Sequence, residues 1–103
     1  MIKVSVFYPN SSDGTFDMPY YVNSHIPMVR RKLGAALKGV SVEEGLAGGA
    51  PGAPATYSAL GHLLFDSVDA FQQAWAVHGD AIVSDVPNYT NTQPIIQLSE
   101  VKL

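Results

Sequence analysis

The first residues of the chain alternate between apolar and polar positions. From Ile2 to Tyr8, the even positions carry Ile, Val, Val and Tyr, and β-branched residues predominate among them. A period of two with this composition predicts a β-strand. The turn-forming stretch at residues 9–14, with the sequence PNSSDG, is expected to end it.

A helical pattern follows Asp17, which is expected to cap the helix. Apolar residues recur there at steps of three and four and share one helix face: Val22, Ile26, Val29, Leu33 and Ala36. Pro27 lies inside this pattern and cannot donate a hydrogen bond to the carbonyl of Asn23, so we expect a kink or break. Gly34 or Gly39 is expected to end the helix.

The second half of the chain repeats this order of elements. Residues 37–46 and 56–66 predict two strands, joined by a loop at 47–55 that contains only Ala, Gly and Pro. Alternation assigns one face of the later strand to Tyr57, Ala59, Gly61, Leu63 and Phe65. Ser67 is expected to cap a second helix, and Gly79 to close it, with further turns possible over 80–86. Residues 94–103 predict a last strand.

The predicted order is βαββαβ, which indicates one α+β domain over residues 1–103. Right-handed crossovers of two such halves give a four-stranded antiparallel sheet with both helices on one face, the ferredoxin-like arrangement. The first and third strands are expected to lie at its centre.

The strands carry apolar residues at both odd and even positions, and therefore on both faces of the sheet. Examples are Phe7 beside Val6, and Leu64 beside Leu63. The helices can cover only one of these faces. An uncovered apolar face favours association, so we expect a homodimer whose two sheets pack face to face in a dimeric α/β barrel.

Composition narrows the chemistry. The chain has 103 residues, no cysteine and a formal net charge of -3. The absence of cysteine excludes disulfide scaffolds, Cys-ligated metals and thiol nucleophiles. The negative net charge offers little attraction for nucleic acid. The N-terminal sequence MIKVSVFYPN resembles neither a signal peptide nor a membrane span, so we expect a cytoplasmic protein that contacts no membrane.

The segment from Tyr20 to Pro27 is the first candidate site. Tyr21 and His25 are four residues apart and share a helix face, and Tyr20 lies at the edge of that face. His25 is a candidate general acid or base, with Tyr21 as its catalytic partner and Tyr20 as a substrate contact. Alternatively, His25 is a structural histidine that is hydrogen-bonded for stability.

The second helix offers Trp75 and His78 as substrate contacts. His78 continues the apolar stripe formed by Val68, Phe71 and Trp75, which allows it to face the same interior as His25. The alternative role for His78 is an interaction with the helix dipole. The third histidine, His62, is expected to be structural and to lie on the dimer side of the sheet.

The segment at residues 85–90, with the sequence DVPNYT, combines a helix stop with turn residues. Tyr89 is a candidate substrate contact whose hydroxyl projects into a cavity, and Asp85 is a candidate to orient a histidine. The three histidines have no metal-binding spacing, so no metal site is expected.

These segments together resemble the EthD family, named for ethyl tert-butyl ether degradation. The resemblance rests on Phe7-Tyr8-Pro9, Tyr20-Tyr21, His25-Ile26-Pro27-Met28 and, above all, residues 85–94. It implies a ferredoxin-like protomer in a dimeric α/β barrel, and it directs attention to His25 with the adjacent tyrosines. Related dimeric barrels include cofactor-free monooxygenases, cyclases, isomerases and haem-dependent enzymes.

Two functions remain open at this level. The first is a homodimer that binds or transforms a small apolar organic molecule between sheet and helices, by His-mediated proton transfer or by cofactor-independent oxidation. The second is a non-catalytic accessory dimer that supports a monooxygenase degradation pathway. No cofactor is expected, with haem bound through His25 or His78 as the alternative.

Overall fold

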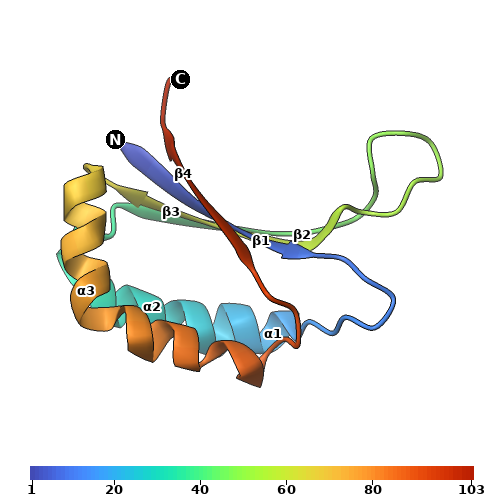
Figure 1. The fold of residues 1–103 in the computed structure, drawn as a ribbon, viewed down its shortest axis with the longest axis horizontal. Helices are drawn as coiled ribbons and strands as arrows, with labels where there is room; N and C mark the ends of the chain where they lie inside the picture. Colours follow the sequence, from blue (N-terminus) through green and yellow to red (C-terminus); the bar gives the residue numbers. More distant parts are fainter.

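The computed structural model describes residues 1–103 and contains one four-stranded antiparallel sheet (Figure 1). Its strands are β1 (Ile2–Pro9), β2 (Gly39–Glu44), β3 (Tyr57–Phe65) and β4 (Ile95–Glu100). They lie in the order β2-β3-β1-β4, so the first and third strands are central, as predicted.

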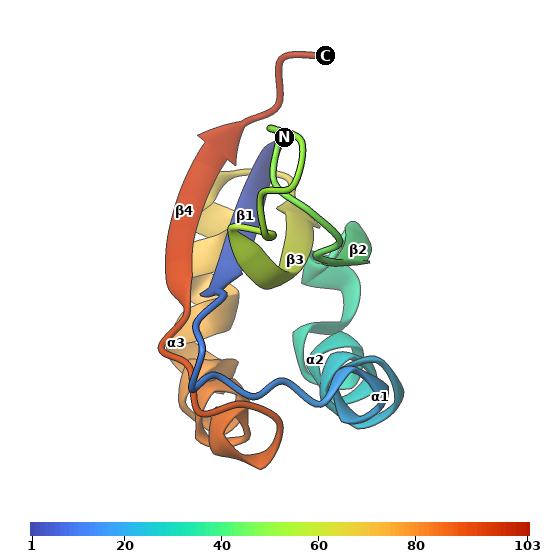
Figure 2. The ribbon, with the colours of Figure 1, turned by 90° about the vertical axis from the view of Figure 1, so that its right-hand side faces the viewer.

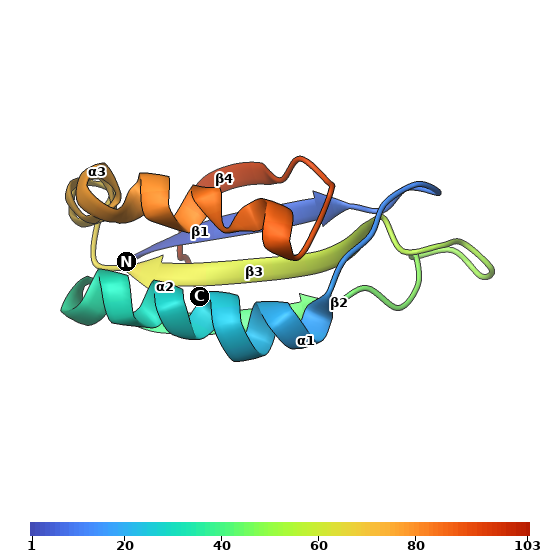
Figure 3. The ribbon, with the colours of Figure 1, turned by 90° about the horizontal axis from the view of Figure 1, so that it is seen from below.

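The helices cover one face of this sheet. The first helical stretch comprises α1 (Met18–Tyr20), the π-helical turn η1 (Tyr21–His25) and α2 (Ile26–Leu33), and the second is α3 (Val68–Ser84). Figures 2 and 3 show α1 and α2 beneath the β2–β3 side of the sheet and α3 beneath the β1–β4 side. The predicted α+β ferredoxin-like fold is therefore confirmed. No helix combines the length and the apolar character that crossing a membrane requires.

Pro27 changes the helix in a different way from the expected kink or break. The residues before it widen into the π-helical turn η1, in which the Ile26 N–H bonds the carbonyl of Tyr21, five residues back. A π-turn relieves the crowding between the proline ring and the preceding turn while the chain continues as a helix. Gly34 then ends α2 with a positive φ of 54°, one of the two predicted stops.

Two buried clusters fill the space between sheet and helices. The larger cluster includes Phe65 and Val29, the most deeply buried large side chains, and lies at the end of the sheet near the start of β1. The smaller cluster is largely aromatic and comprises Tyr8, Tyr21, Ile26, Ala59 and Tyr89. The candidate site lies in this second cluster.

Gly79 does not close the second helix, and that prediction is wrong. Helix α3 continues through it to Ser84, and Gly79 is buried against Trp75. A Cβ at position 79 would lie 2.7 Å from the indole Nε1 of Trp75. Glycine is required at this position because the indole packs directly against the helix backbone. It does not end the helix.

A β-bulge also corrects the predicted parity of β3. The pairing of β1 with β3 shifts after Tyr8, which pairs with Ala59, whereas Pro9 pairs with Tyr57. Ser58 is the additional residue and donates a hydrogen bond to the carbonyl of Tyr8. Tyr57 therefore lies on the outer face of the sheet, with its ring centroid 5.0 Å from that of Phe7.

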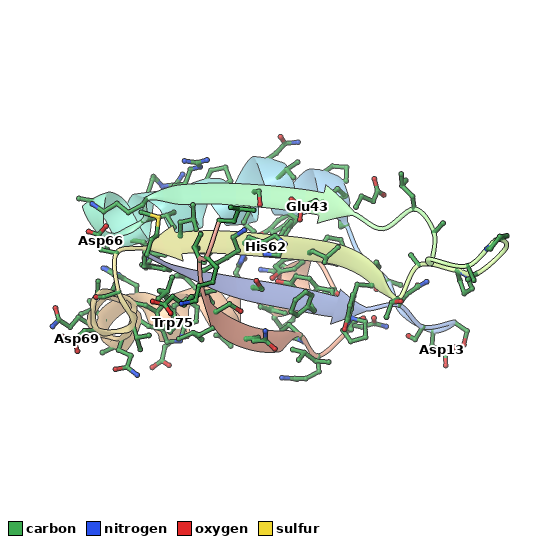
Figure 4. All side chains as sticks on the ribbon, turned by 90° about the horizontal axis from the view of Figure 1, so that it is seen from above. Asp13, Glu43, His62, Asp66, Asp69 and Trp75 are labelled. Atoms are coloured by element: carbon green, nitrogen blue, oxygen red, sulfur yellow. The ribbon has the colours of Figure 1, made fainter.

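No helix covers the outer face of the sheet, where Figure 4 shows Glu43 and His62. His62 binds Ser5 Oγ through Nδ1 at 2.8 Å and Glu43 Oε1 through Nε2 at 3.0 Å. These contacts join three adjacent strands, in keeping with the structural role expected for His62. The apolar residues Phe7, Leu60 and Leu64 share this face and are only half-buried.

Replacing Gly79 with alanine should destabilise the protein. The new methyl group would force Trp75 out of its position. The free energy lost in this way exceeds the free energy gained because alanine favours a helix more than glycine does, so the free energy of unfolding should fall by about 1 kcal/mol. Urea denaturation followed by circular dichroism measures it. The control Gly49→Ala meets open space and should change stability by less than about 0.5 kcal/mol. Equal stability of both variants would contradict the packing role of Gly79.

Candidate functional site

A cavity of about 490 Å³ opens between the two helices and the sheet. Most of its lining is apolar, with 12 of 20 residues hydrophobic, and it extends from Trp75 and Leu63 to the aromatic cluster. Its size suits a small organic molecule, because ligand cavities usually measure about 300–1,000 Å³. Polar groups gather at one end, around His25 and Tyr89.

The imidazole of His25 is held by a carboxylate. Its Nδ1 lies 2.8 Å from Asp85 Oδ2, and only 5% of the His25 side chain is exposed. Because a carboxylate can only accept, Nδ1 carries a proton, and in the neutral ring Nε2 is then the nitrogen with the lone pair. His25 belongs to the π-turn η1 and Asp85 follows the last residue of α3, so both helices must pack correctly for the pair to form.

Asp85 is itself fixed by two further donors. The Tyr20 hydroxyl donates to Oδ1 at 2.8 Å, and the Asn88 side-chain amide donates to the same oxygen at 2.9 Å. Burial acts to raise the pKa of Asp85, but the hydrogen bonds from Asn88, His25 and Tyr20 outweigh it and hold the pKa below its usual range. Asp85 is therefore an anion with a fixed orientation.

The pKa of His25 is lowered from its ordinary value of 6.5. Burial is the main cause because it disfavours the charged imidazolium, and the carboxylate of Asp85 opposes it without cancelling it. His25 is consequently neutral near pH 7, which is the protonation state that a general base needs.

The hydroxyl of buried Tyr89 lies next to His25 Nε2, and the hydroxyl of buried Tyr8 lies next to that of Tyr89. The Tyr89 hydroxyl lies 3.5 Å from His25 Nε2 and 2.7 Å from the Tyr8 hydroxyl. Burial raises the pKa of both tyrosines well above the ordinary value, so both remain protonated hydrogen-bond donors. The site thus places a base and a hydroxyl donor side by side at the end of an apolar cavity.

Tyr21 shapes the site by packing. Its ring stacks on the imidazole of His25, with centroids 5.4 Å apart and an interplanar angle of 14°. Its hydroxyl lies against Gly61, where a Cβ would collide with it. Burial keeps the pKa of Tyr21 above its ordinary value. The glycine in β3 therefore makes room for this tyrosine on the cavity side of the sheet.

The structure brings most of the predicted site residues together. The lining residues include His25, Tyr21, Tyr89 and Trp75. Tyr20 is not among them and instead binds Asp85, the partner of His25. His78 is not among the lining residues. The interior stripe of α3 runs from Trp75 through Gly79 to Ile82, which leaves His78 on the flank of that stripe.

Tyr8 is a site residue that the sequence did not single out, and Asp85 was suggested only as an orienting group. Tyr8 occupies the last cavity-facing position of β1, and its strand parity signalled burial but no chemistry. Its role depends on Tyr89, which is 81 residues away along the chain. No local motif indicates such a pair.

No group of three or more His, Asp or Glu side chains lies close enough together to hold a metal ion.

Comparison with known proteins supports a family assignment. Residues 13–93 match the family model of the EthD domain. An EthD-like protein from Ralstonia eutropha JMP134 has 43% sequence identity and a TM-score of 0.94, covering 99% of this chain and 92% of that chain. None of the curated proteins matches the chain.

Two more solved structures share the fold at lower identity. SnoaB, a cofactor-independent oxygenase from Streptomyces nogalater, is 11% identical with a TM-score of 0.64, covering 99% of this chain and 92% of that one. A dimeric ferredoxin-like protein of unknown function from Thermobifida fusca YX is 17% identical with a TM-score of 0.59, covering 97% and 90%. At these identities the likeness shows the fold alone.

Asp85→Asn should lower the pKa of His25 further. The carboxylate and its hydrogen bond both raise that pKa, so removing the negative charge leaves burial less opposed. NMR titration of the His25 ring should give a midpoint below 6.5 in the unmodified protein and a lower one in the variant. Asp69→Asn, at an exposed position in the first turn of α3, should leave the midpoint unchanged. A midpoint that rises or stays constant in Asp85→Asn would contradict the assigned pair.

Proposed function

Because the chain belongs to the EthD family, with a ferredoxin-like fold that a cofactor-independent oxygenase also has, we propose that it binds a small apolar organic molecule and moves a proton on it. The observation that carries this proposal is that His25 lines an apolar cavity while its Nδ1 is held by Asp85, which leaves Nε2 as the nitrogen that can accept a proton. The arrangement is that of a general base. The reaction proposed uses no cofactor.

The proton transfer follows from the contacts of His25. Nε2 accepts a proton from the bound molecule, and the imidazolium that forms is stabilised by Asp85 2.8 Å away. Asp85 cannot turn away because Tyr20 and Asn88 hold its other oxygen. Tyr20 is thus a positioning residue. Trp75 and Tyr21 supply apolar walls, and His78 takes no part.

The outer face of the sheet gives the second component of the proposal, a homodimer. Phe7, Leu60 and Leu64 lie there without a covering layer, and isologous packing of a second copy would bury them. The dimeric protein from Thermobifida fusca provides a precedent for this fold. Since the chain contains no cysteine and gains nothing from an oxidising compartment, the proposal places it in the cytoplasm.

The base can be tested with 5-nitrobenzisoxazole, an apolar probe that opens to a coloured phenolate when a base removes its single reactive C–H proton. The protein should accelerate this opening over buffer, and His25→Gln should reduce the rate by about 100-fold, a typical contribution of general base catalysis. His78→Gln is the matched control and should retain the full rate. If the probe binds the cavity and His25→Gln opens it as fast as the unmodified protein, His25 is no base and the accessory, ligand-binding role replaces catalysis.

The dimer can be tested by light scattering at micromolar concentration. The expected mass is twice the 11.0 kDa of one chain. Leu60→Asp places a charge on the outer face and should shift the mass to that of a single chain, because an unpaired buried charge is costly. Leu46→Asp, at a fully exposed loop position, should leave the dimer intact. A mass of 11.0 kDa for the unmodified protein would contradict the dimer.

A further inference from the structure

We propose that the molecule processed at this site is an enolisable carbonyl compound, whose carbonyl oxygen is bound by the Tyr89 hydroxyl while His25 Nε2 removes a proton from the adjacent carbon. This inference rests on the proposed function and gives it a substrate class. It comes from the spacing of the base and the donor.

The two groups stand 3.5 Å apart, measured from His25 Nε2 to the Tyr89 hydroxyl oxygen. In a carbonyl compound the α-carbon and the carbonyl oxygen are about 2.4 Å apart, from standard bond lengths. A base and a donor 3.5 Å apart can therefore each contact one of these two atoms of the same molecule. The observed spacing allows one carbonyl compound to engage both groups at once.

A phenol or alcohol fits less well. Its single oxygen would have to give its proton to Nε2 and accept the hydrogen of Tyr89 at the same time. With both contacts at about 2.8 Å, a spacing of 3.5 Å between the two protein atoms forces an angle of roughly 80° at that oxygen, which is too acute for two good hydrogen bonds. The spacing therefore favours a substrate that loses its proton from carbon.

The hydrogen of Tyr89 is available for this role. His25 Nε2 can only accept, because Nδ1 carries the ring proton and donates it to Asp85. The proposal assigns the hydrogen of Tyr89 to Nε2, which can only accept, and makes Tyr8 the donor in the 2.7 Å bond between the two hydroxyls, where either hydroxyl can donate. The contact to Nε2 is long at 3.5 Å, so a carbonyl oxygen can take over the hydrogen at little cost and leave Nε2 free.

The step is balanced by groups on the protein. The α C–H bond breaks and its proton goes to Nε2, while its electron pair forms the new C=C bond. The carbonyl π pair moves to oxygen, where the Tyr89 hydroxyl stabilises the charge. Tyr8 holds the Tyr89 hydroxyl in place through the hydrogen bond between the two hydroxyls. Returning the proton to the same carbon gives exchange, and returning it to another carbon gives isomerisation. Neither outcome needs an oxidant or a second reactant.

The test uses 2-tetralone, a bicyclic ketone, with α-proton exchange in D₂O followed by NMR. The protein should exceed the rate in buffer at least tenfold. His25→Gln should abolish the gain, and Tyr89→Phe should reduce it about tenfold or more, as expected on loss of one oxyanion donor. Tyr57→Phe, on the outer face of the sheet, should exchange at the full rate. Full activity in Tyr89→Phe would overturn the assigned donor.

Two further results separate the proposals. If the protein opens 5-nitrobenzisoxazole but does not accelerate exchange in 2-tetralone, or if it instead ionises bound 4-nitrophenol, the carbonyl class is overturned and the base remains. If the protein accelerates neither the opening of 5-nitrobenzisoxazole nor the exchange in 2-tetralone, the proposed function itself fails. Should Tyr89→Phe not fold, Tyr8→Phe decides: it weakens the support of Tyr89 and should slow exchange several-fold, and an unchanged rate would overturn the proposal.

Discussion

A hydrogen bond of 2.8 Å joins the imidazole of His25 to the carboxylate of Asp85 and so links the two helical stretches that cover the sheet. Its partners lie 60 residues apart, one in the π-turn before Pro27 and one just beyond α3. Burial disfavours a charged imidazole, and the carboxylate limits this effect while it fixes the tautomer. The proposed chemistry depends on which nitrogen of the ring is left without a proton.

The architecture imposes a second constraint, because two helices can cover only one face of the sheet. The inner face carries the cavity and its aromatic cluster. The outer face carries Phe7, Tyr57 and the network of His62 with Ser5 and Glu43. The sheet therefore carries apolar side chains on both of its faces, which accounts for the apolar composition of so small a chain.

Local pattern was sufficient to predict the fold and part of the site. Periodicity and turn residues identified all four strands and both helices, and the spacing of Tyr21 and His25 placed them on one face. The local pattern gave wrong predictions where packing overrides local preference. Gly79 makes room for the indole of Trp75 inside α3, and a bulge moves Tyr57 to the outer face. Tyr8 escaped notice because its role requires a partner 81 residues away. No helix-local spacing can reveal a pair formed across the sheet.

The tautomer of His25 is the most direct test of this account. Long-range ¹H–¹⁵N correlation of the imidazole ring at pH 7 reports the protonation of each nitrogen separately. We predict a protonated Nδ1, bonded to Asp85, and an unprotonated Nε2. A ring protonated at Nε2, or at both nitrogens, would leave no base at this position and would contradict the central claim.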